Sequence, residues 1–228
     1  MNSFISRRRL LMGLVLFPAE PESYLEIVRY TSSGSFFAPE DGFFEIELHG
    51  ASGCGGEAKT SGEEGIPGGG GGGGGGGGFS ASRVKMRKGD KIFCDSGAVG
   101  NSSTAKIESS IDRSHNITVY PAENGKEPPH IWDDPKDIEL EGGNGGAGGK
   151  AEGGNFRNLE GLSGGKGSSD PKAKEAPAAG TKGISQAIGG RNGGLGGTIF
   201  DSGSWGLHSR DGEKGENGFI KIYAGNKN

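Results

Sequence analysis

The sequence predicts an all-β protein, in which an antiparallel β-sandwich or sheet is combined with a bundle of polyglycine-II helices. Fifty of the 228 residues are glycine and only 30% are hydrophobic, so a conventional apolar core can serve only part of the chain. Several stretches alternate apolar and polar residues, which is typical of strands. Most glycines fall in two blocks and repeat every third residue there. We divide the chain into an N-terminal docking segment, residues 1–23, and a glycine-rich domain, residues 24–228.

Strands are expected where β-branched and aromatic residues recur with a period of two, within 24–50, 79–141 and 217–225. The individual strands are expected at 24–30, 42–50, 79–86, 90–97, 116–120, 137–141 and 219–225. Arg87-Lys88-Gly89 predicts a hairpin-like turn between two of them. The last strand is expected to close a sheet that begins near residue 24.

The two glycine blocks, 50–78 and 142–217, predict polyglycine-II segments. "GGNGGAGGK" at 142–150 is three triplets, and Gly190, Gly193 and Gly196 keep the same spacing. A polyproline-II-type helix has three residues per turn, so this spacing places glycine on fixed faces. A face without Cβ atoms allows a second helix to approach to backbone contact, where N–H groups bond to carbonyls.

The run of eleven glycines, Gly68–Gly78, has no side chain on any face. We expect it in the middle of the bundle, and the alternative is a disordered glycine-rich linker. Residues 98–141 are more charged and poorer in glycine than the two glycine blocks. β-Structure is therefore expected there in place of the first part of the bundle. Residues 155–183 are expected to loop out between two glycine helices.

No catalytic constellation is evident, and we expect a protein that is not an enzyme and has no cofactor. The lysines at 150 and 166 lack the first glycine and the hydroxyl of a phosphate-binding loop. The histidines are scattered, which argues against a metal site. Whether Cys54 and Cys94 pair stays open. The net charge of −4 gives no sign of nucleic-acid binding.

The N-terminal segment combines a basic stretch with an apolar one, and we expect it to dock onto a partner protein. Its candidate docking residues are Arg7, Arg8, Arg9, Leu10, Leu11, Leu14 and Phe17. If it were exposed to water, the apolar stretch would promote aggregation. The alternative is an export signal, although the stretch is short and no small-residue cleavage site follows. It is also too short to insert across a membrane.

Two stretches contain aromatic residues among residues that are common in loops, prolines and acids in the first and Ser, Gly and Asp in the second, and such a composition resembles that of binding loops. The first is 128–137 and the second is 200–212. The candidate binding residues are His130, Trp132, Phe200, Trp205 and His208. The alternative is that the two tryptophans are ordinary core residues at the ends of the sheet or bundle.

The order of these parts resembles the glycine-rich domain of phage and prophage tail proteins, over roughly residues 30–225. The matching positions are Phe37-Ala38-Pro39, Gly50-Ala51-Ser52-Gly53, Lys88-Gly89-Asp90 and Asn217-Gly218-Phe219. That family includes tail-fibre-tip adhesins of T-even-like phages, in which loops on a polyglycine-II bundle contact the host receptor.

The resemblance implies a component of the virion tail or exterior that binds a protein or glycan on the host cell surface. Residues 1–23 would attach it to other virion proteins, and it could form a homo-oligomer. The alternatives are a purely structural virion protein of the tail, baseplate or capsid decoration, or a secreted protein of the bacterial surface.

Overall fold

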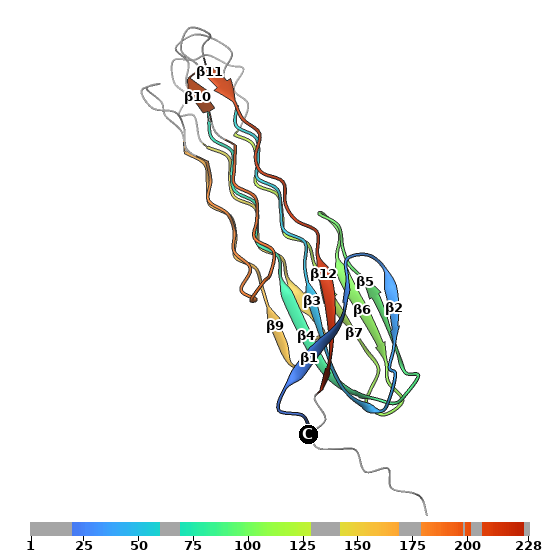
Figure 1. Ribbon diagram of the computed structural model, residues 1–228. Coiled ribbons are helices and arrows are strands. Elements are labelled where there is room, and N and C mark those ends of the chain that lie inside the picture. Colours follow the sequence, from blue (N-terminus) through green and yellow to red (C-terminus); the bar gives the residue numbers. More distant parts are fainter. Residues whose placement is uncertain are drawn as a thin grey trace, which may run out of the picture.

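The computed structural model describes residues 20–59, 69–128, 142–168, 179–197, 199–201 and 207–225. Within these ranges the protein is all-β, with two five-stranded antiparallel sheets and no helix. The molecule is elongated: the sheets form one end, and a rod of extended segments runs away from them (Figure 1). We call the two ends of the rod the sheet end and the loop end.

Sheet 1 has the strand order β1-β12-β3-β4-β9. Its strands are β1 (Tyr24–Tyr30), β12 (Phe219–Gly225), β3 (Gly42–His49), β4 (Phe79–Met86) and β9 (Arg157–Leu159). The first and last long strands of the chain pair with each other, with Tyr24 opposite Gly225. The expected closure of the sheet is therefore confirmed.

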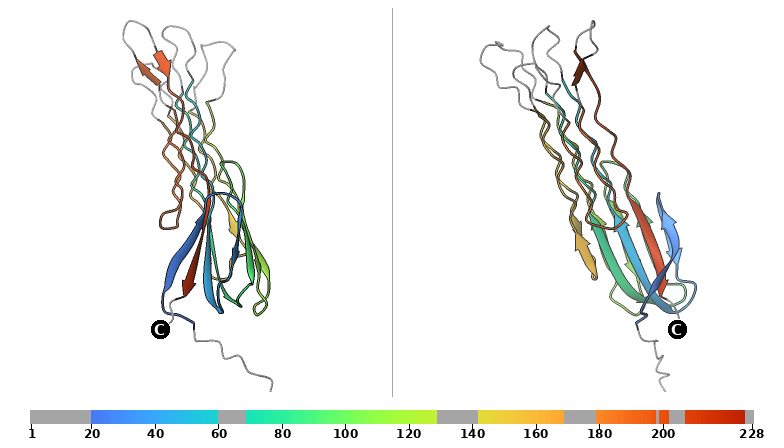
Figure 2. Two further views of the ribbon diagram at one scale, coloured as in Figure 1. Left: turned by 45° about the vertical axis from the view of Figure 1, so that its right-hand side comes forward. Right: turned by 60° about the vertical axis from the view of Figure 1, so that its left-hand side comes forward.

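Sheet 2 has the order β2-β5-β6-β7-β8. Its strands are β2 (Gly34–Phe37), β5 (Lys91–Asp95), β6 (Ser103–Glu108), β7 (His115–Val119) and β8 (Ala151–Glu152). The two sheets face each other, and their inward residues form one hydrophobic core (Figure 2). Its fully buried members include Phe44, Ile46, Leu48, Ile107 and Ile222.

The expected strands at 24–30, 42–50, 79–86, 90–97, 116–120 and 219–225 are confirmed, with small shifts at their ends. The expected strand at 137–141 lies outside the described residues. The hairpin prediction at Arg87-Lys88-Gly89 is wrong, because β4 belongs to sheet 1 and β5 to sheet 2. Gly89 does adopt a positive φ of 89°, and Asp90 accepts a hydrogen bond from the Arg87 amide. This turn crosses from one layer to the other.

The rod consists of eight described segments that run alternately away from the sheets and back. They are 50–59, 69–78, 120–128, 142–150, 160–168, 179–185, 190–197 and 210–218. Over their described residues these segments form no β-strand, and only Lys59 and Gly69 make an isolated β-bridge. They are joined instead by backbone hydrogen bonds, most of which recur at every third residue along a segment.

Segment 69–78, the described part of the glycine run, lies at the centre of the rod. Its amides at Gly71, Gly74 and Gly77 donate to segment 190–197. The amides between them donate in turn to segments 120–128 and 160–168, and its carbonyls accept from 50–59, 142–150 and 179–185. Every residue of Gly69–Gly78 is buried. This part of the run is a hydrogen-bonded element and not a linker.

The six neighbours of segment 69–78 also bond to one another and close a ring around it. The order around the ring is 50–59, 120–128, 142–150, 160–168, 179–185, 190–197 and back to 50–59. The eighth segment, 210–218, lies outside the ring and bonds to 50–59 and 190–197. A side chain on the central segment would collide with its neighbours: a Cβ at Gly73 would meet the carbonyl oxygen of Thr181.

Two sequence predictions about the rod are wrong. Residues 120–128 were expected as part of a β-rich stretch, but this segment belongs to the ring, because the Gly125 amide and its neighbours bond along 50–59 and 142–150. Residues 155–183 were expected to loop out. Their described parts instead supply β9 and two ring segments, since Gly161, Gly164 and Gly167 bond to segment 142–150.

Candidate functional site: the loop end of the rod

Four pairs of described chain ends meet at the loop end (Figure 2). The pairs are 59 and 69, 128 and 142, 168 and 179, and 201 and 207. Hydrogen bonds fix the first three together: Lys59 and Gly69 exchange two, and the Gly70 amide donates to Ser168. The Gly143 amide donates to Gly70. Each intervening stretch of chain therefore starts and finishes on the same end of one bonded scaffold.

A two-stranded ribbon extends the rod at this end. It pairs β10 (Ile199–Asp201) with β11 (Leu207–Ser209), which continue segments 190–197 and 210–218. The backbone of Phe200 pairs with that of His208, so the fold brings these two candidate residues together at the loop end. His130, Trp132 and Trp205 lie outside the described residues.

The two candidate loops connect to neighbouring segments of the rod. Residues 129–141 connect ring segments 120–128 and 142–150, whereas 202–206 connect β10 to β11. Segment 50–59 bonds both to 120–128 and to 210–218. A single segment therefore separates the points at which the two loops join the scaffold. A ligand that contacts both stretches is therefore compatible with the scaffold.

Charged side chains line the outside of the rod towards this end. Lys59 forms an ion pair with Glu127 across adjacent segments, and both side chains are partly exposed. Lower on the rod, the Lys182 ammonium lies 2.6 Å from the Glu213 carboxylate. The hydrogen bond from Lys182 is the main cause that lowers the pKa of Glu213. The first pair joins segments whose backbones are already bonded, whereas the second joins segments 179–185 and 210–218, which share no backbone hydrogen bond in the described part of the chain.

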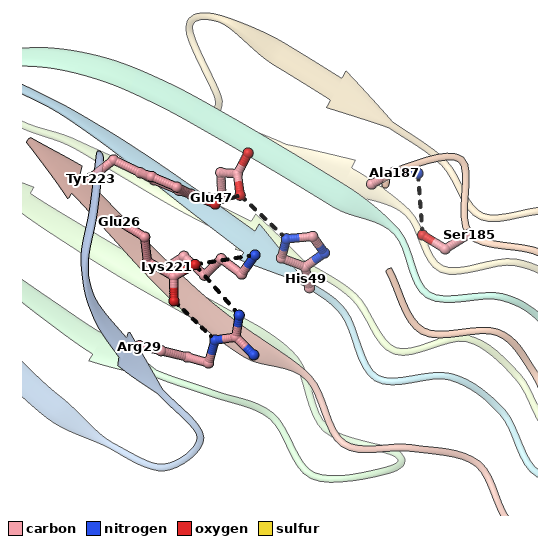
Figure 3. A network of polar contacts seen from close by, with 8 residues as sticks. All are labelled: Glu26, Arg29, Glu47, His49, Ser185, Ala187, Lys221 and Tyr223. Atoms are coloured by element: carbon pink, nitrogen blue, oxygen red, sulfur yellow. Dashed lines mark hydrogen bonds and ion pairs between the residues drawn. The ribbon is translucent and has the colours of Figure 1, made fainter. Parts of the chain in front are cut away.

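A second cluster lies at the sheet end, where the rod meets sheet 1 (Figure 3). His49 is the last residue of β3 and only 1% exposed, although strand alternation puts it on the outer face with Glu45 and Glu47. Its ring stacks on Phe219 at 4.1 Å between centroids and meets Phe79 edge-on at 4.9 Å. Neither ring nitrogen has a hydrogen-bond partner.

Charged groups surround this stack. The guanidinium carbon of Arg191, from the rod, lies 4.9 Å from the centroid of the Phe219 ring. That of Arg29, from β1, lies 5.2 Å from the same centroid. The Glu47 carboxylate is 3.6 Å from His49 Nε2 and accepts a hydrogen bond of 2.6 Å from the Tyr223 hydroxyl. Lys221 Nζ is 3.4 Å from the Glu26 carboxylate. We call the set His49, Phe79, Phe219, Glu47 and Arg191 the junction cluster.

Burial determines the ionisation of His49, whereas polar neighbours determine that of Glu47. Burial is the largest cause that lowers the pKa of His49, and it outweighs the opposite effect of Glu47. Burial by itself would raise the pKa of Glu47, but His49, the Tyr223 hydroxyl and Lys221 bring it below its usual value. At neutral pH, His49 is therefore neutral and Glu47 ionised. Strand alternation predicts an exposed His49, because it does not show that the neighbouring strands place Phe79 and Phe219 against the ring.

The predicted docking residues Arg7, Arg8, Arg9, Leu10, Leu11, Leu14 and Phe17 lie outside the described part of the chain. The described chain begins at Glu20, which lies 3.3 Å from Arg83 on the outer face of sheet 1. Pro21 packs against Gly225, so both described termini are at the sheet end, opposite the candidate loops.

Cys54 and Cys94 are both free thiols. Burial raises the pKa of Cys94 to about 12, so this thiol stays protonated at neutral pH. Within the described ranges, no group of three or more His, Cys, Asp or Glu side chains is placed to hold a metal ion. Over the same residues, no helix has the length and apolar character needed to span a membrane.

No family model matches the sequence, and a search of curated proteins found no match to it.

Proposed function

We propose that the protein is a tail component of a phage or prophage virion, and that it binds a receptor on the host cell surface through the loop end of its rod. The observation that carries the proposal is the meeting of four pairs of chain ends at one end of a bonded scaffold, away from both described termini. Binding residues are commonly found on loops held by a rigid scaffold. The order of the sequence motifs along the chain, which resembles that in phage tail proteins, supports the same proposal.

We further propose that the rod is a polyglycine-II bundle. The support is the recurrence of backbone hydrogen bonds at every third residue, together with a buried central run that has room for no Cβ. Such a bundle orders its backbone without side-chain packing, and offsets the entropy of ordered glycine by pairing nearly every buried amide. The backbone angles test this directly. Values near φ −75° and ψ +145° in 69–78 are expected, and β-strand pairing in that segment would refute it.

In this proposal residues 1–23 attach the protein to other virion proteins at the sheet end. The direction of the rod then points the loops outward, towards the cell. The receptor would be contacted by the stretches that contain His130, Trp132, Phe200, Trp205 and His208. The receptor is a protein or a glycan of the host cell surface.

The test replaces the candidate loops and keeps the scaffold. In one variant residues 129–141 become a Gly-Ser linker of equal length, and in a second residues 202–206 do. Binding of the fluorescent full chain to a panel of bacterial strains is compared with that of Lys106→Gln, a matched surface change on sheet 2, where Lys106 is exposed. Loop replacement should abolish cell binding with unchanged melting temperature, and Lys106→Gln should change neither.

Binding that survives both loop replacements would exclude the loop end as the receptor site. One observation favours the alternative, a structural virion protein: Phe37 and Phe93 expose phenyl rings on sheet 2, which could contact a neighbouring protein. A particle reconstruction that buries the loop end between subunits would support that alternative.

A further inference from the structure

Asn-Gly dipeptides recur in the described rod, at Asn124, Asn144, Asn192 and Asn217. Three of them make the same pair of contacts. At Asn124, the carboxamide oxygen accepts a hydrogen bond of 2.8 Å from the Cys54 amide, while the following Gly125 amide donates one of 2.8 Å to the Cys54 carbonyl. The dipeptide thus holds a neighbouring backbone at two points, an arrangement that we call an Asn-Gly clamp.

Two further clamps lie at the sheet end and differ from the first in that their two bonds reach different residues of the neighbouring segment. In both, the asparagine oxygen accepts from one amide, and the glycine amide donates to the carbonyl two residues earlier on the same neighbouring chain. The bonds are Ser185 N to Asn192 and Gly193 N to Gly183 O, then Val99 N to Asn217 and Gly218 N to Gly97 O, all 2.8 to 3.0 Å.

Asn144 departs from this design. Its side chain is exposed on ring segment 142–150, and only its main-chain carbonyl is bonded, to the Lys126 amide. Among the residues that the structure describes, its carboxamide has no hydrogen-bond partner, and neither has the Gly145 amide. The two groups that are hydrogen-bonded in the clamps are thus without such a bond to the described residues here.

We propose that Asn144 is the site at which the folded protein undergoes spontaneous deamidation. The Gly145 main-chain nitrogen attacks the Asn144 side-chain carbonyl carbon, a C–N bond forms, and the carboxamide nitrogen leaves as ammonia. Water then opens the resulting five-membered imide at either carbonyl. The products are aspartate and isoaspartate, with one ammonia lost and one water gained and no change of oxidation state. Glycine favours the attack because it has no Cβ to obstruct it.

The clamps block the same reaction at the other three dipeptides. There the attacking nitrogen is committed as a donor and the carbonyl oxygen as an acceptor, so the reaction needs a local opening of the rod first. Opening free energies add directly to the barrier, and about 1.4 kcal/mol of opening already slows the reaction tenfold.

The isoaspartate product has a structural consequence at this position. It inserts an extra main-chain atom between Gly143 and Gly146, whose amides donate to Gly70 and Gly73 of the central segment. Both bonds depend on an unbroken spacing of three residues. Isoaspartate at 144 therefore cannot keep both in register, whereas aspartate adds only a charge.

The experiment ages the full-length folded protein in mildly alkaline buffer, well below its melting temperature. Peptide mapping by mass spectrometry then gives the rate of acid formation at each Asn-Gly dipeptide. Asn144 is expected to react at least about tenfold faster than Asn124, Asn192 or Asn217. In urea-unfolded protein the four rates should converge, and Asn144→Gln should remove the fast component of ammonia release.

Either of two results would overturn the proposal. One is a rate at Asn144 in the folded protein that is no higher than at the three clamped sites. The other is an unchanged preference for Asn144 in the unfolded chain, which would assign the selectivity to local sequence and not to the clamps.

Discussion

His49 shows how burial changes the chemistry of a single residue at the place where sheet 1 meets the rod. Its ring is neutral between Phe219 and Phe79, and burial holds its pKa below the ordinary value of about 6.5. A base whose pKa is lower in the folded state binds a proton more readily when unfolded. Its contribution to stability is therefore complete above pH 6.5 or so and is lost as the pH falls below it.

We expect the free energy of unfolding to fall between about pH 7 and pH 5 in the wild type, and to fall less in His49→Phe, which keeps the ring but cannot be protonated. Urea titrations at several pH values measure this difference. The charged groups that act on His49 are Glu47, Lys221 and Arg191, and none of them has an ordinary pKa inside this window. Parallel pH profiles of the two proteins would contradict the assignment.

The glycines of the central segment can be tested against a glycine elsewhere that has room. A Cβ at Gly73 would meet the Thr181 carbonyl oxygen, whereas a Cβ at Gly42 would make only an ordinary 3.9 Å contact with the Phe44 ring. Overpacking of a rigid site costs about 1–3 kcal/mol and more where backbone must move. Gly73→Ala should lower the free energy of unfolding by at least about 3 kcal/mol, and Gly42→Ala by less than about 1. Equal losses in denaturant titrations would argue against close backbone contact at Gly73.

At the scale of elements, the clamps predict which asparagines stabilise the rod. Asn124→Ala, Asn192→Ala and Asn217→Ala each leave a backbone amide without its acceptor, at Cys54, Ser185 and Val99. The cost of such a loss is about 1–3 kcal/mol for a buried group and less for an exposed one. We expect a fall in melting temperature of about 2–4 °C for each 1 kcal/mol lost.

Asn144→Ala is the matched control, because the described rod contains no acceptor role for that side chain. Its melting temperature should stay within about 1 °C of the wild type. The clamp description fails if thermal unfolding shows the same loss in all four variants.

The strands were predictable wherever one face is apolar and the other polar. Phe44, Ile46 and Leu48 alternate with Glu45 and Glu47, and β3 followed from that pattern. Strand β6 was not predicted from the sequence. Its inward residues Ser103 and Ala105 are too small to produce a clear alternation of apolar and polar residues. The turn at Lys88-Gly89 also carries no information on whether the next strand joins the same sheet, so the hairpin prediction failed there.

Segment 120–128 shows why the ring could not be read fully from glycine spacing. It has one glycine, Gly125, because only the face towards the central segment requires the absence of a Cβ. Its other positions carry Glu123, Asn124 and Lys126, which are exposed. A ring segment with a single buried face resembles a polar loop in sequence. Composition alone indicates Phe200 and His208 as candidate residues, whereas their backbone pairing depends on a ribbon that composition does not specify.

At the scale of the whole molecule, the attachment proposal predicts separate roles for the N-terminus and the domain. Deletion of residues 2–17 should leave a soluble protein with wild-type melting behaviour, because the sheets are complete from β1 onward. The same protein should no longer incorporate into particles, as measured by its co-sedimentation with them. Glu20 is kept, so its ion pair with Arg83 is unchanged. Loss of folding in the deletion variant would show instead that the segment belongs to the core.

The placement of both described termini at the sheet end also determines how the molecule responds to mechanical tension. A pull between the loop end and the sheet end acts along the segment axes, so segments must shear past one another against many backbone hydrogen bonds at once. A pull between residues 20 and 225 bypasses the rod and unzips β1 from β12 one pair at a time. The chain is thus mechanically strongest along the line that joins its loops to its base.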